Sequence, residues 1–297
     1  MGKATLKFSF FVGRPKGLHY YTLLFVVATV GCTSNPEAVR LATTTSVENS
    51  GLLAEVLPAF ERQSHIKVDV LAVGSGQALN LLRRGEVAVG LTHDPRAEAQ
   101  ALASGIITDY RKIMFNDFII VGPSGDPAGV ARASGVAEAF ARIAAAGALF
   151  VSRGDASGTY SREQELWALV KRRPSGDRLL ETGQGMGGTL RVANEMNAYT
   201  LSDRATFEQF RSGLRLVPLY EGGPELLNTY AIFLRAGVAG RERAEATDLA
   251  HWLSDGDGRR LVAGFAAHGR TVFKVWPMGT SRSHPADLPS RELANAR

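Results

Sequence analysis

The sequence predicts an α/β protein of two lobes, each a mixed or parallel sheet flanked by helices, with a ligand site in the cleft between them. Three observations support this fold class. Short apolar, β-branched runs alternate with amphipathic runs along most of the chain, which is the pattern of strands and helices packed in layers. Stretches rich in glycine and proline, near residues 122–128 and 221–226, interrupt the alternation. Three loops that follow apolar runs are rich in serine, threonine and glycine. Two lobes joined by two crossings suit hinge closure on a ligand.

The first 31 residues are typical of an export signal. They hold four basic residues and no acidic one, and end in an apolar run over residues 20–31 that is too short to span a bilayer. Cys32, the only cysteine, follows directly, and its junction with Val30 and Gly31 resembles a bacterial lipoprotein cleavage site. We expect a periplasmic or extracytoplasmic protein tethered by lipidation of Cys32. A plain secretory signal and a retained anchor are the alternatives.

The charge of the chain gives no sign of a nucleic-acid partner. The 297 residues include 34 basic and 29 acidic side chains, for a formal charge of +5. Without the four basic residues of the signal, 30 basic residues face 29 acidic ones. Binding to nucleic acid requires a basic surface, so we expect no such partner, and contact with a membrane only through the lipid anchor.

The first lobe is expected over residues 37–122 and again over residues 225–276. Its first helix places Leu53 and Phe60 on one apolar face, at helical spacing. In chain order, the expected strands cover residues 39–42, 66–73, 87–92, 115–122 and 229–234, and the expected helices cover residues 52–63, 77–84, 95–104 and 241–252.

The second lobe is expected over residues 123–224. Ser202 or Asp203 is expected to cap one of its helices, because both residue types accept hydrogen bonds from a free helix N-terminus. The expected strands cover residues 148–152 and 214–220, and the expected helices cover residues 134–146, 157–172, 187–197 and 204–210. The tail over residues 277–297 is polar and aperiodic, so we expect it to be disordered.

The three polar loops, over residues 43–51, 74–77 and 152–159, each lie between an expected strand and an expected helix. Serine, threonine and glycine are preferred helix caps, so structure alone explains any one loop. Three together, at the carboxyl ends of parallel strands, bring several helix N-termini with unpaired N–H groups to one place. Arg153 adds a planar cation that matches tetrahedral oxoanions. The alternative role for Arg153 is a salt bridge with Asp155, and both roles can hold, because Asp155 can orient Arg153. The loops therefore predict a site for a small anion.

Other motifs point to no cofactor, metal or catalytic site. Residues 183–188 match the dinucleotide pattern G-x-G-x-x-G, but no convincing strand precedes them. The six histidines lack metal-ligand spacing. His93 and Asp94 follow an expected strand and are interpreted as a structural or cleft-edge pair. A hydrolase that uses His93 and a serine is the rival from another class, although no G-x-S-x-G motif supports it.

Several motifs, in order, carry a family resemblance. TTTSVENSGLL, VGSGQAL, FNDFIIVGPSGDPA, FVSRGDASGTYSREQELW, GMGGTL and AYTLSDRATF together resemble the tungstate-binding component of tungstate-specific ABC importers, over residues 38–275. The resemblance implies a periplasmic-binding-protein fold of type II, no enzymatic activity, a monomer, and an ABC permease in the cytoplasmic membrane as partner. By position, it implies ligand contacts from Thr44, Thr45, Ser46 and Ser75 in the first lobe and from Arg153, Ser157, Gly158 and Thr159 in the second.

The nearest alternative ligand is phosphate, because phosphate receptors share the R-x-D-x-S-G-T and G-S-G patterns. Phosphate carries protons at neutral pH, so a selective site needs a carboxylate acceptor. Tungstate and molybdate carry none, and a carboxylate facing them opposes binding. Our hypothesis is that Asp94, near the expected mouth, does not contact the anion. Only the resemblance favours tungstate over molybdate. An effector-binding domain of a regulator is a third class, which the export signal and the lack of a DNA-binding helix pair disfavour.

Overall fold

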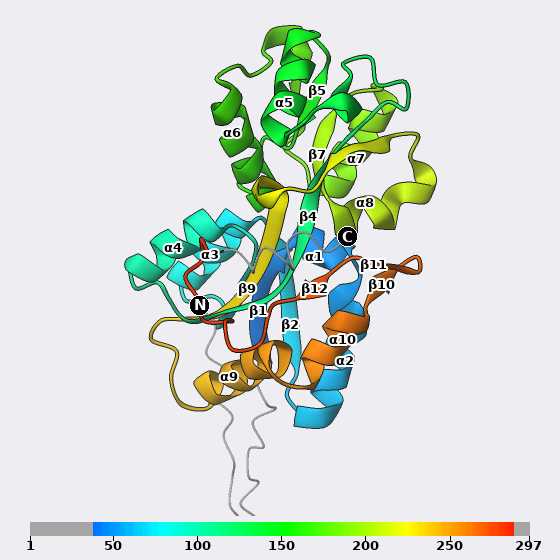
Figure 1. Cartoon of the computed structure of the whole chain (residues 1–297). Coiled ribbons are helices and arrows are strands. Elements are labelled where there is room, and N and C mark those ends of the chain that lie inside the picture. The colour runs from blue at the N-terminus through cyan, green and yellow to red at the C-terminus, as the bar shows by residue number, and fades with distance from the viewer. Residues whose placement is uncertain (1–37, 288–297) are drawn as a thin grey trace, which may run out of the picture. The chain divides into compact units, whose positions relative to one another are not determined.

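The computed structural model describes residues 38–287, which lie within one compact unit (Figure 1). The predicted export signal and Cys32 fall outside these residues. The strands are β1 (Val39–Thr44), β2 (Val68–Val73), β3 (Val89–Thr92), β4 (Ile107–Gly122), β5 (Phe150–Ser152), β6 (Leu179–Glu181), β7 (Thr200–Asp203), β8 (Val217–Glu221), β9 (Leu227–Arg235), β10 (Ala266–Ala267), β11 (Arg270–Thr271) and β12 (Lys274–Val275). The α-helices are α1 (Thr45–Asn49), α2 (Leu52–Ser64), α3 (Ser75–Arg83), α4 (Pro95–Ala103), α5 (Val136–Ala145), α6 (Gly158–Val170), α7 (Met186–Glu195), α8 (Arg204–Phe210), α9 (Gly240–Ser254) and α10 (Asp257–Gly264).

The main sheet has the strand order β12-β4-β9-β3-β1-β2. β1 pairs in parallel with β2 and β3, whereas β9 pairs antiparallel with β3 and β4. The sheet is therefore mixed, as the sequence predicts. The loops after β1, β2 and β3 leave from the same edge because these three strands run in the same direction, and this places the first two polar loops close together.

β4 is 16 residues long and belongs to two groups of strands. Residues 107–117 pair with β9, and residues 118–122 pair with β7 and β8. In Figure 1, β4 runs from the sheet that carries β1 and β9 to the group that carries β7. This pairing favours a first crossing near Asp117, several residues before the predicted lobe boundary at 122.

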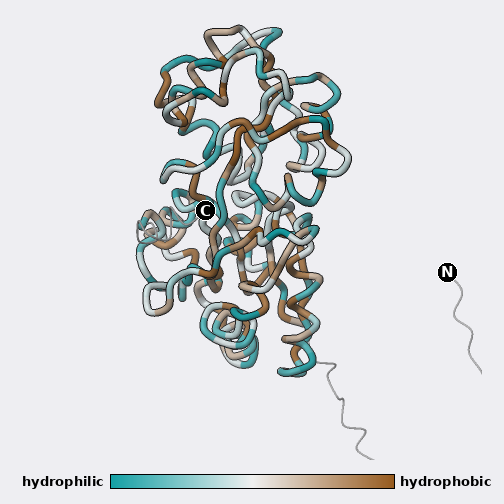
Figure 2. The backbone as a smooth tube through the Cα atoms, turned by 45° about the vertical axis from the view of Figure 1, so that its right-hand side comes forward, coloured by the Kyte–Doolittle hydropathy of each residue, from teal (hydrophilic) through white to brown (hydrophobic). Residues whose placement is uncertain are grey.

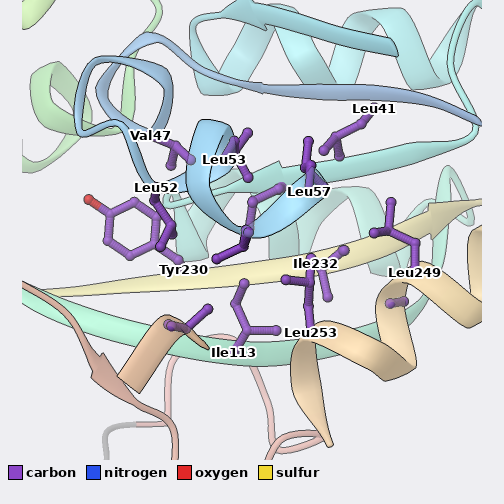
Figure 3. Close-up of a cluster of buried hydrophobic side chains, with 14 of the residues drawn as sticks. Leu41, Val47, Leu52, Leu53, Leu57, Ile113, Tyr230, Ile232, Leu249 and Leu253 are labelled. Carbon is purple, nitrogen blue, oxygen red and sulfur yellow. The ribbon is translucent and has the colours of Figure 1, made fainter. Parts of the chain in front are cut away.

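Separate apolar clusters lie on the two sides of that crossing. One packs α2, α9 and α10 against the main sheet, with Leu53, Ile232 and Leu253 at its centre (Figure 3). Another gathers Phe140 and Trp167 from α5 and α6, whose rings meet edge to face with centroids 4.4 Å apart. Figure 2 shows brown, hydrophobic stretches alternating with teal, hydrophilic ones along the backbone. Each group of strands thus has its own buried core.

The sequence predicts most elements but underestimates the length of β4. Charged residues in its first half hide the apolar pattern there. Arg111 is buried and pairs with Asp109 at 3.0 Å, and Lys112 is fully buried. Helices α1 and α10 are not predicted, because each is short and polar or glycine-containing. The short strands β6, β7, β10, β11 and β12, of two to four residues each, are not predicted either.

The C-terminal segment differs from the predicted disorder over residues 277–287. Lys112 Nζ donates to the carbonyl oxygens of His284 and Asp287 at 2.6 and 2.5 Å, and lies 4.4 Å from the centre of the Trp276 ring. A buried ammonium needs such acceptors, and the segment is ordered because it supplies them. No helix among residues 38–287 has the length and apolar character needed to cross a membrane.

Candidate functional site

The first polar loop connects β1 to α1. The Thr44 hydroxyl caps α1 by accepting a hydrogen bond from the Val47 amide at 3.3 Å. Thr45 and Ser46 are the first two residues of the helix, so their amides have no acceptor within it. The Thr45 hydroxyl is buried and has no hydrogen-bond partner among the described residues. This loop therefore offers two amides and one hydroxyl to a ligand.

The second polar loop connects β2 to α3 and touches the third. The Ser75 hydroxyl is fully buried and has no partner within residues 38–287. The Gly76 amide donates to the carbonyl oxygen of Ala156 at 3.0 Å. A Cβ atom on Gly74 would lie 2.9 Å from the same oxygen, which is closer than side chains approach. Glycine at this position therefore permits the close contact between the two loops.

The third polar loop connects β5 to α6 and carries Arg153, which is 3% exposed. One terminal nitrogen of Arg153 donates to Asp155 Oδ2 at 2.5 Å, as the sequence predicts. Its Nε has no partner in the described part of the chain. The Ser157 hydroxyl donates to Asp155 Oδ1 at 2.5 Å and caps α6 by accepting from the Tyr160 amide. The hydroxyl of Thr159 is buried without a partner in residues 38–287.

Further contacts link the first and third loops. A Cβ on Gly158 would lie 2.5 Å from the carbonyl oxygen of His93, so α6 begins directly against the end of β3. His93 in turn bonds Ser46 in the first loop at 3.1 Å. On the other side, α1 contacts α7 and α8, and Gly185 at the start of α7 lies beside the Thr45 hydroxyl. The predicted site residues are therefore gathered in one place.

Four buried donors in these loops lack partners. An unsatisfied buried donor costs about 1–3 kcal/mol, and such groups are rare in folded proteins. They belong to the three loops that the contacts above bring together, at the starts of three helices. Such a set of donors suits a small ligand that has several acceptor oxygens and negative charge. The four atoms are Thr45 Oγ1, Ser75 Oγ, Arg153 Nε and Thr159 Oγ1.

The remaining hydroxyls predicted for the site have protein partners. Thr44 Oγ1 lies 3.0 Å from Ser46 Oγ, and Ser46 Oγ lies 3.1 Å from His93 Nε2. Ser157 is occupied by Asp155 and the cap of α6. The structure thus divides the predicted hydroxyls into free donors and supporting groups, which the sequence alone does not do.

His93 is held by a buried network that sequence reasoning missed. Its Nδ1 lies 2.9 Å from Asn228 Oδ1. The Asn228 amide nitrogen donates to Asn116 Oδ1 at 2.9 Å and to the Tyr230 hydroxyl at 2.8 Å. Burial and, to a smaller extent, the charge of nearby Arg153 lower the pKa of His93 to about 3. The imidazole is therefore neutral near pH 7. The two asparagines lie directly opposite each other on β4 and β9, a pairing the sequence does not reveal.

Asp94 caps α4, with Oδ1 accepting from the Ala97 amide at 3.1 Å. Burial raises its pKa, while hydrogen bonds from Ala97 and from Ser161 on α6 lower it. Its carboxylate thus has partners on α4 and α6. That Asp94 does not contact the anion remains a prediction.

A second carboxylate, Asp203, lies near Arg153. It is fully buried and caps α8, with Oδ1 accepting from the Thr206 amide at 2.9 Å, as one of the two predicted caps. Burial raises the pKa of Asp203, and the nearby charge of Arg153 opposes that rise. The sequence marks Asp203 only as a cap and gives no signal that it lies near Arg153.

Comparisons with known proteins agree with the geometry. Residues 31–255 match the family model described as a PBP superfamily domain. The chain is 38% identical over 245 residues to a putative ABC transporter anion-binding protein of Haloferax volcanii, covering 80% of this chain and 71% of that protein. It is 37% identical over 224 residues to the tungstate-binding protein TupA of Peptoclostridium acidaminophilum, covering 71% and 78%. The crystal structure of the tungstate ABC transporter from Geobacter sulfurreducens superposes with a TM-score of 0.69 at 39% identity, covering 77% of this chain and 99% of that one.

Proposed function

Because the chain belongs to the PBP superfamily and to the tungstate-binding proteins of ABC transporters within it, we propose that it is an extracytoplasmic receptor for tungstate. It closes around the anion and delivers it to an ABC permease. The four unpartnered donors carry this proposal. Tungstate brings four oxygens and a charge of −2, which match three free hydroxyls, the guanidinium of Arg153 and the ends of three helices.

The eight predicted contact residues divide into two roles in this proposal. The side chains of Thr45, Ser75, Arg153 and Thr159 bind oxygen directly, because their donors are buried and free. Thr44, Ser46, Ser157 and Gly158 contribute backbone amides or hold the loops in place.

Hinge closure is the proposed motion. The first lobe comprises the main sheet and the second comprises β5 to β8, with crossings near Asp117 and Leu227. Arg204 on α8 binds Asp117 at 2.5 Å and Glu221 at 2.6 Å, which links α8 to the chain near both crossings. We further propose a monomer, anchored through lipidated Cys32. Selection of tungstate over molybdate is likewise part of the proposal.

A hydrolase is the rival class, and one observation bears on it. Ser46, His93 and Asn228 are arranged like a catalytic triad. A general base works best with a pKa near the operating pH, whereas the pKa of His93 is lowered to about 3. The imidazolium formed during catalysis would also be buried near Arg153. These charges disfavour catalysis, and we propose that the protein binds without turnover.

Calorimetric titration of the protein from Thr33 onward tests the function. Tungstate should bind one to one, with molybdate as the closest competitor and with sulfate and phosphate much weaker. The Arg153→Gln variant should lose tungstate binding, and Arg243→Gln, on an exposed part of α9, is its matched control. Binding of phosphate without binding of tungstate would show that the ligand is phosphate and refute the assignment of tungstate. Binding of none of the four anions would refute the proposal as a whole.

A further inference from the structure

We propose that His93 is a positioning residue that sets the selectivity of the site by directing the hydroxyl protons of Thr44 and Ser46 away from the bound anion. This inference rests on the proposed function and deepens it. It concerns which tetrahedral anion the site accepts, and it starts from the buried network on β9 and β4.

Asn228 fixes the tautomer of His93. The amide nitrogen of Asn228 is used by Asn116 Oδ1 and the Tyr230 hydroxyl, at 2.9 and 2.8 Å. The amide oxygen therefore faces His93 Nδ1, at 2.9 Å. An amide oxygen only accepts, so Nδ1 carries the proton and donates it to Asn228.

The neutral imidazole then accepts at Nε2. Because Nδ1 holds the only ring proton, Ser46 must donate its hydroxyl proton to Nε2, across 3.1 Å. Ser46 Oγ is then free to accept from Thr44 Oγ1, across 3.0 Å. Thr44 already accepts from the Val47 amide. Both hydroxyl protons thus point along the chain of hydrogen bonds that ends at His93.

The direction of these protons affects where an anion can bind. A hydroxyl whose proton is committed elsewhere presents lone pairs, which repel anionic oxygens. The free hydroxyl donors are those of Thr45, Ser75 and Thr159, on three different helices. A large tetrahedral anion reaches all three at once. A smaller anion would have to bind closer to one side of the site. On the side of Ser46, it would meet a hydroxyl oxygen that accepts hydrogen bonds instead of a group that donates them.

Charged and titratable groups around His93 preserve this arrangement. Arg153 disfavours protonation of the ring, Tyr230 on β9 lies with its ring centre 5.0 Å away, and the charge of Asp203, at the end of β7, acts on that tyrosine. Asp94 follows His93 directly and is turned toward α4 and α6. None of these groups hydrogen-bonds the ring, so Asn228 and Ser46 determine its tautomer.

Selectivity is measured in three variants by titration with tungstate and with sulfate. His93→Leu removes both ring nitrogens and frees the Ser46 proton, so affinity for sulfate relative to tungstate should rise about tenfold, the lower end of what one hydrogen bond to a charged group contributes. His93→Gln keeps an acceptor and a donor and should restore most of the original ratio. Phe118→Leu, beside the ring at 6.2 Å, changes packing only and should lower Tm without changing the ratio.

A second measurement does not depend on anion binding. Nitrogen-15 NMR of the histidine rings should find the proton of His93 on Nδ1 at pH 7. A proton on Nε2, or an unchanged selectivity ratio in a folded His93→Leu protein, would overturn the inference. If the wild-type protein binds none of the anions, the proposed function fails, and the NMR result still decides the direction of the hydrogen bonds.

Discussion

The Ser75→Ala substitution should stabilise the ligand-free protein while weakening its binding of tungstate. The Ser75 hydroxyl is fully buried and has no hydrogen-bond partner within residues 38–287. Removing an unsatisfied buried hydroxyl recovers about 1–3 kcal/mol of desolvation cost. For a protein of this size, that raises Tm by about 2–10 °C. Stability rises and affinity falls for the same reason, because the Ser75 hydroxyl has a hydrogen-bond partner only when the ligand is bound.

Binding should weaken by about 10- to 150-fold, since a hydrogen bond to a charged group contributes about 1.5–3 kcal/mol. Thermal unfolding without ligand and calorimetric titration measure the two effects on the same preparation. Ser254→Ala is the matched control, because Ser254 is equally buried but bonds Asp255 at 2.6 Å and Arg111 at 3.3 Å. That variant should lose about 1–2 kcal/mol of stability and bind tungstate normally. A Ser75→Ala protein with a lower Tm, or with unchanged affinity, would refute the assignment of Ser75 as a free donor.

Three other perturbations test separate features. Burial raises the pKa of Glu98 from 4.5 to about 7, so the folded state holds this proton more tightly; the free energy of unfolding should fall by about 3 kcal/mol as pH rises from 4.5 through 7. Urea titrations of Glu98→Gln should lack that fall, and an unchanged slope would contradict the assignment. Asp203→Asn removes a negative charge near Arg153 and should strengthen tungstate binding several-fold by calorimetry. Weaker tungstate binding would contradict this reasoning, and loss of a phosphate affinity seen in the wild type would make Asp203 an acceptor for a protonated anion. Ending the chain after Thr280 removes two carbonyl acceptors of Lys112 and should cost about 3 kcal/mol in thermal unfolding, whereas ending it after residue 290 keeps them and is the control.

The fold was predictable where the pattern of side chains has a single explanation. Helix α2 is the clearest case, because its buried Leu53 and Phe60 recur at helical spacing. The first half of β4 was not predictable, since Arg111 and Lys112 look like surface residues. Their burial depends on Asp109 and on the carbonyls of a segment more than 170 positions away.

The candidate site was predictable as a set of loops but not as a set of roles. Serine and threonine before a helix look the same whether they cap it or bind a ligand. Ser157 caps α6, whereas Thr159, two residues later, keeps a free hydroxyl. The network of His93 depends on Asn116 and Asn228, which only the pairing of β4 with β9 brings together. The residues around Asn116 and Asn228 in the sequence do not indicate that pairing.

The position of β9 in the main sheet also governs how the chain folds. β9 lies between β3 and β4, yet residues 227–235 are made more than a hundred residues after β3. Until residues 227–235 have been made, β3 and β4 each expose an unpaired edge, and the apolar cluster between the main sheet and α2 lacks the side chains of β9. Sheets that depend on such distant pairing fold slowly. The main sheet therefore cannot be completed before residue 235 has been made, so its assembly depends on residues far along the chain.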